Sequence, residues 1–203
     1  MVFELDRLLG GRRVILASKS PRRQELLGLI FPSFDIVPAV GEEIIPEGTP
    51  AHKASELLAV QKCREVAEKY PSALVIGCDT TVVLGDEILG KPADNADAAR
   101  MLRELSGSTH KVISGCAVSL QGELISFSQE TSVTFRKLTE AEISAYVATG
   151  EPSDKAGSYG IQEKGSLLVE KIEGDFFNVV GLPVTELALT VNKLLGGDSD
   201  AVR

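Results

Sequence analysis

The stretch VISGCAVSLQGELISFSQETSVTF, residues 112–135, decides the fold of this chain. Valine, isoleucine, threonine and phenylalanine recur in its two arms, residues 112–120 and 124–135, and Gln121-Gly122 lies between them. Residues of these types favour extended strands, and a short link that contains glycine favours a tight turn. The stretch therefore predicts a long antiparallel hairpin.

Helical and extended patterns alternate on both sides of this hairpin. Strands are predicted at residues 13–17, 73–77 and 167–172, and a smaller hairpin at residues 82–89. Helices are predicted at residues 22–29, 50–69, 96–105, 139–146 and 183–195, with N-caps from Ser20, Thr49, Asp94 or Asn95, and Thr139, the last in a capping box with Glu142. Strands mixed with helices and a long hairpin indicate an α/β fold, in which helices flank a mixed twisted sheet.

The length of 203 residues suits one large domain or two small lobes that share a cleft. We expect one domain over residues 1–203, with residues 196–203 as a flexible tail. Hydrophobic residues make up 43% and charged residues 25%, and no run approaches the roughly 20 apolar residues of a membrane span. Residues 1–11 include three charged side chains, which a signal peptide would lack, so we expect a soluble, cytoplasmic protein with no membrane partner.

Charge and cysteine content exclude further classes of protein. The net charge of −8 argues against broad nucleic-acid binding, which needs a basic face. Structural zinc and a disulfide framework are not expected, because only Cys63, Cys78, Cys116, His52 and His110 are available and no CxxC pair occurs. The phosphate loop GxxxxGK[ST], the GxSxG elbow and the HExxH motif are absent from the sequence.

Residues 152–162, PSDKAGSYGIQ, crowd polar and glycine residues into what the pattern predicts to be a turn. Gly157 and Gly160 allow a ligand to approach the backbone, and Gln162 offers both a donor and acceptors. Such a loop could read a flat polar ring. The alternative is a solvated turn with an internal ion pair between Asp154 and Lys155.

Cations near predicted loop edges suggest an anion site in this acidic chain. The helix start at Ser20-Pro21 presents free backbone amides, which attract phosphate. Phosphate also suits the nearby side chains Arg22, Arg23, Lys62, Lys91 and Lys155. Each alternatively is a surface charge, and Lys62, on an apolar helical stripe, could extend along its stem to water.

Carboxylates supply the complementary chemistry. Asp79 follows the strand predicted at residues 73–77, where α/β sheets place ligand sites, and Glu42-Glu43 lies in a polar loop. Such groups suit magnesium or manganese and can polarise an attacking water, so hydrolysis is a candidate reaction. The alternatives are a solvated loop for the glutamates and a cap for Asp79. His110 could contact a substrate, but a helix-to-strand turn explains residues 106–110 equally well and is the interpretation that we favour.

Motifs in order along nearly the whole chain resemble the Maf family of nucleoside triphosphate pyrophosphatases. They are LASKSPRR at residues 16–23, GCDT at 77–80, KP at 91–92, SGSTH at 106–110, GEPSDKAGSYGIQ at 150–162, GD at 174–175 and NVVGLP at 178–183, with Glu43 and Lys62 at the expected spacing. The resemblance implies a fold like that of Maf and ITPase proteins, with two lobes around a central cleft. It also implies hydrolysis of a nucleoside triphosphate to the monophosphate and pyrophosphate, with Mg²⁺ or Mn²⁺ as cofactor.

The same resemblance implies residue roles. Asp79 would be the catalytic proton acceptor, and Glu43 together with Asp79 would serve the metal. Phosphate binding would fall to Ser18, Arg23, Lys62, Lys91 and Lys155, and substrate choice to Arg22, Thr80 and Gln162. The AGSYGIQ run favours the branch that acts on dTTP, UTP and modified pyrimidines, in a house-cleaning role for the nucleotide pool.

Two residues depart from the family pattern, and one alternative function stays open. Cys78 replaces the usual alanine beside Asp79, and Glu163 replaces the glycine that commonly follows Gln162, which adds bulk and charge near the expected base pocket. The family also suggests a homodimer. The alternative function is a nucleotide-binding regulator of cell division and septum formation, which would bind nucleotide without turnover.

Overall fold

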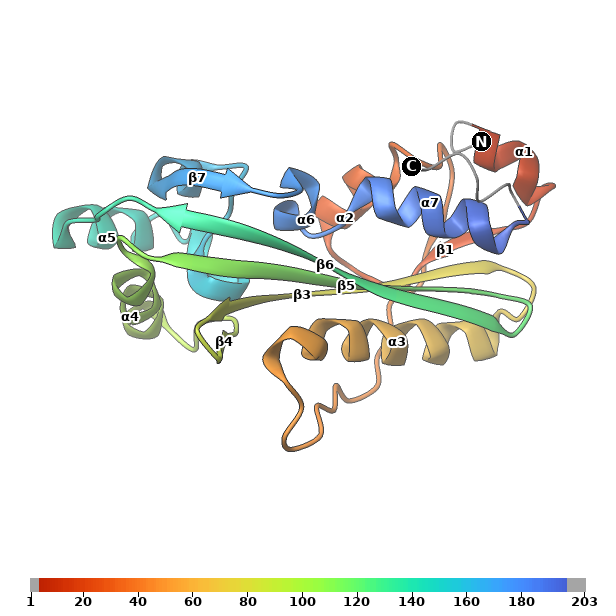
Figure 1. Cartoon of the computed structure of the whole chain (residues 1–203), viewed down its shortest axis with the longest axis horizontal. Helices are drawn as coiled ribbons and strands as arrows, with labels where there is room; N and C mark the ends of the chain where they lie inside the picture. Colours follow the sequence, from red (N-terminus) through yellow and green to blue (C-terminus); the bar gives the residue numbers. More distant parts are fainter. Residues whose placement is uncertain (1–3, 197–203) are drawn as a thin grey trace.

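The computed structural model describes residues 4–196, and a seven-stranded mixed sheet forms its centre (Figure 1). The strands are β1 (Val14–Leu16), β2 (Asp35–Ile36), β3 (Leu74–Leu84), β4 (Glu87–Leu89), β5 (Thr109–Leu120), β6 (Glu123–Phe135) and β7 (Val169–Glu173). Their order is β2-β1-β3-β5-β6-β7, with β4 paired to β3. β1 runs parallel to β2 and β3, and the other pairs are antiparallel. The predicted α/β fold with a mixed sheet is confirmed.

The hairpin predicted at residues 112–135 is also confirmed, as β5 and β6. Its strands pair from Thr109 with Thr134 to Leu120 with Glu123. The turn places Gln121 and Gly122 at φ of 53° and 86°, the left-handed conformation that a two-residue hairpin turn requires. Glycine adopts this conformation at no steric cost.

Helices cover both faces of the sheet, in two groups (Figure 1). At one end, α3 (Ala51–Lys69) covers one face, and α1 (Leu5–Leu9), α2 (Pro21–Leu27) and α7 (Val184–Leu194) cover the other. At the other end lie α4 (Asn95–Leu105) and α5 (Glu140–Val147), and α6 (Phe176–Val180) contacts β5 and β6. Separate apolar clusters fill the two ends, and β3, β5 and β6 join them.

On the side of β3 that faces away from β5, strand pairing is interrupted, and this gap matters for function. Residues 74–76 of β3 pair with β1, which ends at Leu16, and residues 82–84 pair with β4. Residues 77–81 therefore have a strand neighbour only on the side of β5. Because alternate side chains of a strand point to opposite faces, a cleft at this gap can reach residues of both faces.

Some predicted details were wrong. The strand predicted at residues 73–77 does not stop before Asp79 but continues to Leu84 as β3, because β5 pairs with it from Val75 to Val83. Thr49 does not cap α3: its hydroxyl donates to the carbonyl of Pro46, and Pro50 occupies the cap position. Ser20, Asp94 and Thr139 do cap their helices, and Glu142 completes the predicted capping box.

Several short elements had no sequence signal strong enough to predict them. They are α1, α6, β2 and the 3-10 turns η2 (Glu151–Asp154), η3 (Ala156–Ser158) and η4 (Lys164–Leu168). The last strand begins at Val169, two residues later than predicted, because η4 precedes it. Apart from Gly196, the tail predicted at residues 196–203 lies outside the described residues. Within residues 4–196, no helix combines the length and hydrophobicity needed to cross a bilayer.

α3 packs very close to the sheet at Gly115. A Cβ added to Gly115 would lie 2.2 Å from the backbone nitrogen of Glu56 and 2.3 Å from the carbonyl carbon of Ser55. Backbone atoms of a helix cannot move aside as a flexible side chain can. The contact between α3 and β5 therefore requires glycine at this position.

We expect Gly115→Ala to lower the free energy of unfolding by about 3 kcal/mol, because α3 must shift away from the sheet. Gly90→Ala is the matched control, since a Cβ there meets open space, and we expect it to change stability by less than about 0.5 kcal/mol. Urea unfolding followed by circular dichroism measures both. Equal stability of the two variants would contradict the close packing described here.

Candidate active site

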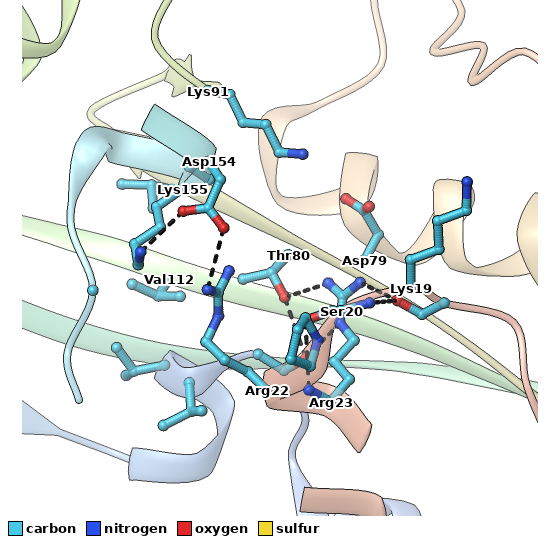
Figure 2. Close-up of a pocket in the computed structure, with 18 of the residues that line it drawn as sticks. Lys19, Ser20, Arg22, Arg23, Asp79, Thr80, Lys91, Val112, Asp154 and Lys155 are labelled. Atoms are coloured by element: carbon cyan, nitrogen blue, oxygen red, sulfur yellow. Dashed lines mark hydrogen bonds and ion pairs between the residues drawn. The ribbon is translucent and has the colours of Figure 1, made fainter. Parts of the chain in front are cut away.

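A cleft of about 510 Å³ opens at the gap along β3 (Figure 2). Every site residue expected from the sequence lines it, namely Ser18, Arg22, Arg23, Glu43, Lys62, Asp79, Thr80, Lys91, Lys155 and Gln162. These residues come from the β1–α2 loop, α2, the loop before α3, α3 itself, β3, the loop after β4 and residues 154–163. The fold thus brings together positions that are far apart in the sequence.

The charges that line this cleft favour an anion. The basic side chains are Lys19, Arg22, Arg23, Lys62, Lys91 and Lys155, and the acidic ones are Glu43, Asp79, Asp154 and Glu163. The cleft is thus lined by six basic and four acidic groups, whereas the whole chain has a net charge of −8. A concave site with an excess of positive charge concentrates anions.

Arg23 builds one wall of the cleft. Its Nε donates to the carbonyl of Gly181 at 3.0 Å, Nη1 to Ser18 Oγ at 3.2 Å and Nη2 to Thr80 Oγ1 at 3.1 Å. Burial by itself would lower the pKa of Arg23, but the neighbouring Cys78 and Asp79 raise it overall. The guanidinium therefore stays charged and fixes the positions of Ser18 and Thr80.

The hydroxyl of Thr80 is oriented by its partners. Ser114 Oγ donates to the carbonyl of Asn178 at 3.0 Å, and the Thr80 and Ser114 hydroxyls are 2.9 Å apart. Because the Ser114 proton is used in its bond to Asn178, Thr80 is the donor between the two hydroxyls; its oxygen also lies 3.4 Å from the Gly181 carbonyl, so in either case its proton is used within the protein. Thr80 also accepts from Arg23, so only its second lone pair is left for a ligand, which must then be a donor.

Lys62 lies between two carboxylates. Its Nζ is 2.5 Å from Asp79 Oδ1 and 2.9 Å from Glu43 Oε1, and the side chains of Lys62 and Asp79 are both only 15% exposed. Lys62 thus does not extend alone to water, as one interpretation of the sequence allowed. The arrangement holds both carboxylates on one cation, although Asp79 comes from β3 and Glu43 from the loop before α3.

Two side chains of α3 hold that loop in place. Glu65 accepts hydrogen bonds from the backbone amides of Val40 and Gly41, and these bonds lower its pKa. Gln61 exchanges two hydrogen bonds with the backbone of Ile44. Since Glu43 lies between these attachment points, its carboxylate is kept within reach of Lys62.

A second group of charges lies where α2 faces η2 (Figure 2). Asp154 is 3.5 Å from Arg22 and 2.9 Å from Lys155, so it links the two. Lys155 Nζ also donates to the carbonyl of Glu151 at 2.8 Å, and the residue is only 8% exposed. Its ammonium group is thus engaged by the protein, which fits the predicted internal ion pair better than a free phosphate ligand.

Lys19 and Lys91 differ from Lys155 in this respect. Within residues 4–196 neither ammonium group has an ion pair or hydrogen bond, and Lys91 extends over the cleft in Figure 2. Lys19 was not expected as a site residue, although its place within LASKSPRR, beside the start of α2, offered a signal. Asp154 lies in the stretch 152–162 suggested as a ligand loop, in which the sequence indicated it as the ion-pair partner of Lys155 and gave it no role of its own.

His110 does not line the cleft. It is 1% exposed in the core of the α4–α5 end, where Nε2 lies 2.8 Å from the Tyr159 hydroxyl and the ring packs edge-on against Phe135. Burial lowers the pKa of His110 to about 4. The residue is therefore a neutral core side chain that supports Tyr159, which itself lines the cleft.

The cleft combines two ammonium groups that are unpaired among the described residues, those of Lys19 and Lys91, with a pair of carboxylates held on one lysine. Such a set can bind several anionic oxygens and accept a proton from water. Neither Asp79 nor Thr80 is a nucleophile activated by a neighbouring base, since their partners are cations or hydroxyl groups. The geometry therefore favours attack by water on a polyanionic substrate.

Comparison with known proteins gives a consistent result. A family model described as Maf-like protein matches residues 13–194. A dTTP/UTP pyrophosphatase of Geobacillus sp. (strain WCH70) is 48% identical over 183 residues, which is 90% of this chain and 98% of that relative. A dTTP/UTP pyrophosphatase of Bacillus mycoides (strain KBAB4) is 48% identical over 189 residues, 93% of this chain and 97% of that relative.

Among solved structures, a HAM1 protein from Coxiella burnetii superposes with a TM-score of 0.53. The match covers 90% of this chain and 99% of that one, at 14% sequence identity. At this identity the likeness concerns the fold alone, and it agrees with the fold expected from the sequence.

The buried His110 makes stability depend on pH. Its folded pKa of about 4 lies below the unfolded value of 6.5, so the unfolded chain binds the proton more readily. We expect this residue to cost about 3 kcal/mol of stability as the pH falls from 7 to 4, and no more below that. His110→Gln should remove this part of the slope in unfolding measured across that range, whereas replacement of the exposed His52 should leave it. A slope unchanged in His110→Gln would refute the assignment.

Proposed function

The chain belongs to the Maf-like protein family, and we propose that it hydrolyses the pyrimidine nucleoside triphosphates dTTP and UTP to the monophosphate and pyrophosphate. The observation that carries the proposal is the cleft, which combines a carboxylate pair with the ammonium groups of Lys19 and Lys91, for which residues 4–196 provide no partner. The name of the relatives at 48% identity supports the choice of triphosphate. Removal of unwanted or modified pyrimidines from the nucleotide pool is the role that we propose for this reaction.

The charges support one orientation of the substrate. Around Arg22 and Lys155 the positive charges are balanced by Asp154 and Glu163, so that end of the cleft is close to neutral. Lys19 and Lys91 have no such partners among the described residues and suit the triphosphate. The base would then lie toward the neutral end, near Gln162.

Asp79 is our candidate for the group that accepts a proton from water. A water that attacks the α-phosphorus forms a new P–O bond, and the bond to the bridging oxygen breaks with release of pyrophosphate. Lys62, which neutralises Asp79 in the absence of substrate, can turn to phosphate oxygens when these are present. That exchange would leave the Asp79 carboxylate free to take the proton.

Asp79 and Glu43 also fit a divalent cation. No three His, Cys, Asp or Glu side chains among residues 4–196 gather into a complete metal site, but two carboxylates together with substrate phosphates and waters are a common way to hold Mg²⁺. The fit is supported by the Lys62 ammonium, which both carboxylates already share. When bound, Mg²⁺ or Mn²⁺ would neutralise charge on the triphosphate.

Two side chains support the preference for thymine and uracil. Thr80 is left with an acceptor toward the cleft, and the N3–H group of these bases is a donor. The amide of Gln162 can pair with both a donor and an acceptor on the same edge. Arg22, held by Asp154, completes the set proposed to choose the substrate.

We also propose a cytoplasmic location and a homodimer. The three cysteines are all buried and unpaired, which suits a reducing compartment. The homodimer rests on the family resemblance, and sedimentation of the purified protein tests it.

Asp79→Asn tests the catalytic assignment. We expect purified protein with Mg²⁺ or Mn²⁺ to release pyrophosphate from dTTP and UTP, and Asp79→Asn to lower kcat by about 10²–10⁴-fold, because the amide cannot accept the proton. Pyrophosphate is measured separately from phosphate over a panel that includes CTP, dATP, GTP and 7-methyl-GTP. Glu170→Gln, an exposed acid outside the cleft, serves as control.

Other results on this panel would lead to different conclusions. Binding of nucleotide without turnover would favour the regulator of cell division. Faster turnover of purine substrates would overturn the role proposed for Gln162 and Thr80.

Lys91→Gln and Lys19→Gln test the phosphate end of the cleft. Each removes one charge that has no partner in the described part of the chain, so we expect KM for dTTP and Kd for pyrophosphate to rise about 10-fold or more. Lys193→Gln, an exposed lysine of α7, is the matched control and should leave both constants unchanged. Unchanged constants in all three variants would remove these lysines from the site.

A further inference from the structure

Residues 159–165 carry Gln162 into the cleft, and they are held at both ends. Tyr159 and Ile161 are 6% and 8% exposed and pack into apolar clusters, whereas Gln162 and Glu163 are exposed between them and Gly165. The position of the Gln162 amide therefore depends on whatever fixes the backbone on each side.

Glu151 takes part in the hydrogen bonds that hold the backbone on both sides of Gln162. Its Oε1 accepts from the Gly165 amide at 3.1 Å and from the Tyr146 hydroxyl at 2.8 Å, and its Oε2 accepts from the Lys164 amide at 3.1 Å. Tyr146 in turn accepts from the Gly160 amide at 3.2 Å. One carboxylate thus fixes the backbone two residues after Gln162 and, through Tyr146, two residues before it.

Tyr146 is suited to link Glu151 to the Gly160 amide. Burial first, and then its hydrogen bond to Glu151, raise the pKa of Tyr146, so the hydroxyl keeps its proton and donates it to the carboxylate. With its proton committed to Glu151, the oxygen is an acceptor for the Gly160 amide. The direction of both hydrogen bonds is therefore determined.

Close packing leaves this segment little room to choose another path. A Cβ at Gly165 would lie 2.4 Å from the Gly160 carbonyl and 2.6 Å from the Tyr146 hydroxyl. A Cβ at Gly160 would lie 2.7 Å from Lys155 Cε and 3.2 Å from Glu151 Oε1. Gly165 is needed for the backbone to approach the Glu151–Tyr146 pair this closely, whereas a Cβ at Gly160 would have to displace the end of the Lys155 side chain.

Lys155 also helps to hold residues 159–165 beside Glu151. Its ammonium donates to the backbone carbonyl of Glu151, and its aliphatic stem packs against Gly160. Glu151 itself is absent from the lining of the cleft, so it does not touch the substrate directly. Its influence must pass through the loop.

We propose that Glu151 is a positioning residue for base recognition: through the amides of Lys164 and Gly165 and the Tyr146 hydroxyl, it holds the Gln162 side chain at the pyrimidine. This inference rests on the proposed function, because the base of dTTP or UTP is the ligand that Gln162 would read. Loss of the Glu151 carboxylate should weaken recognition of the base and leave recognition of phosphate intact.

The products of the proposed reaction separate these two effects. dTMP depends on the base contacts, whereas pyrophosphate has no base. We expect Glu151→Gln to weaken dTMP binding about tenfold or more, since an amide cannot accept from all three donors, and to leave pyrophosphate binding within about twofold. KM for dTTP should rise more than kcat falls. Isothermal titration calorimetry on the full chain measures both affinities.

Glu170→Gln is the matched control, and Tyr146→Phe is a second variant that breaks the attachment before Gln162 while Glu151 stays in place. Tyr146→Phe should also weaken dTMP binding. The loss of dTMP binding free energy in the double variant Glu151→Gln/Tyr146→Phe should be smaller than the sum of the two single losses. Unchanged dTMP affinity in Glu151→Gln and Tyr146→Phe, or equal losses for dTMP and pyrophosphate, would overturn the proposal. If the wild-type chain binds dTMP but releases no pyrophosphate from dTTP, the proposed function fails, and the binding comparison still decides the role of Glu151.

Discussion

The site depends on a gap in the strand pairing along one edge of β3. The strand pairs with β5 along most of its length, yet on the other side β1 stops opposite Ile76 and β4 pairs only with residues 82–84. Asp79 faces Lys62 of α3, and Thr80 faces Arg23 of α2. These are opposite faces of the sheet, and only an open edge lets one cleft reach both. A strand added at this position would separate the acid from the hydroxyl.

The charges of the cleft are arranged so that a substrate can exchange partners with the protein. Lys62 neutralises two carboxylates that would otherwise repel each other and the triphosphate. Arg22 and Lys155 are similarly linked by Asp154. Because Asp154 and Glu43 are more than half exposed, their ion pairs contribute little to stability, and a polyanion can replace them at small cost. Arg23 is different, since its guanidinium donates to three groups of the protein, on Ser18, Thr80 and Gly181, and so fixes the lining of the cleft.

Much of this arrangement could be predicted from the sequence, because it is encoded locally. The hairpin around Gln121-Gly122, the helix start at Ser20-Pro21 and the capping box at Thr139 rest on neighbouring residues. The pairing of side chains could not be predicted in the same way. Arg22 and Asp154, or Arg23 and Gly181, meet only after the chain has folded, and no spacing rule connects them. For that reason the free ammonium of Lys19 and the engaged ammonium of Lys155 look alike in the sequence.

The two residues that depart from the family pattern have different consequences in space. Cys78 lies next to Asp79 in sequence, but it is fully buried in the apolar cluster of the opposite face, with Sγ 3.4 Å from that of Cys116. It can replace a smaller residue without entering the cleft. Glu163 does line the cleft, but its carboxylate is 59% exposed and lies 3.9 Å from the Lys155 ammonium. Since Glu151 fixes the amides of the residues that follow it, this extra side chain need not displace the backbone of Gln162. The same attachment that holds the base-reading amide thus allows the neighbouring position to vary.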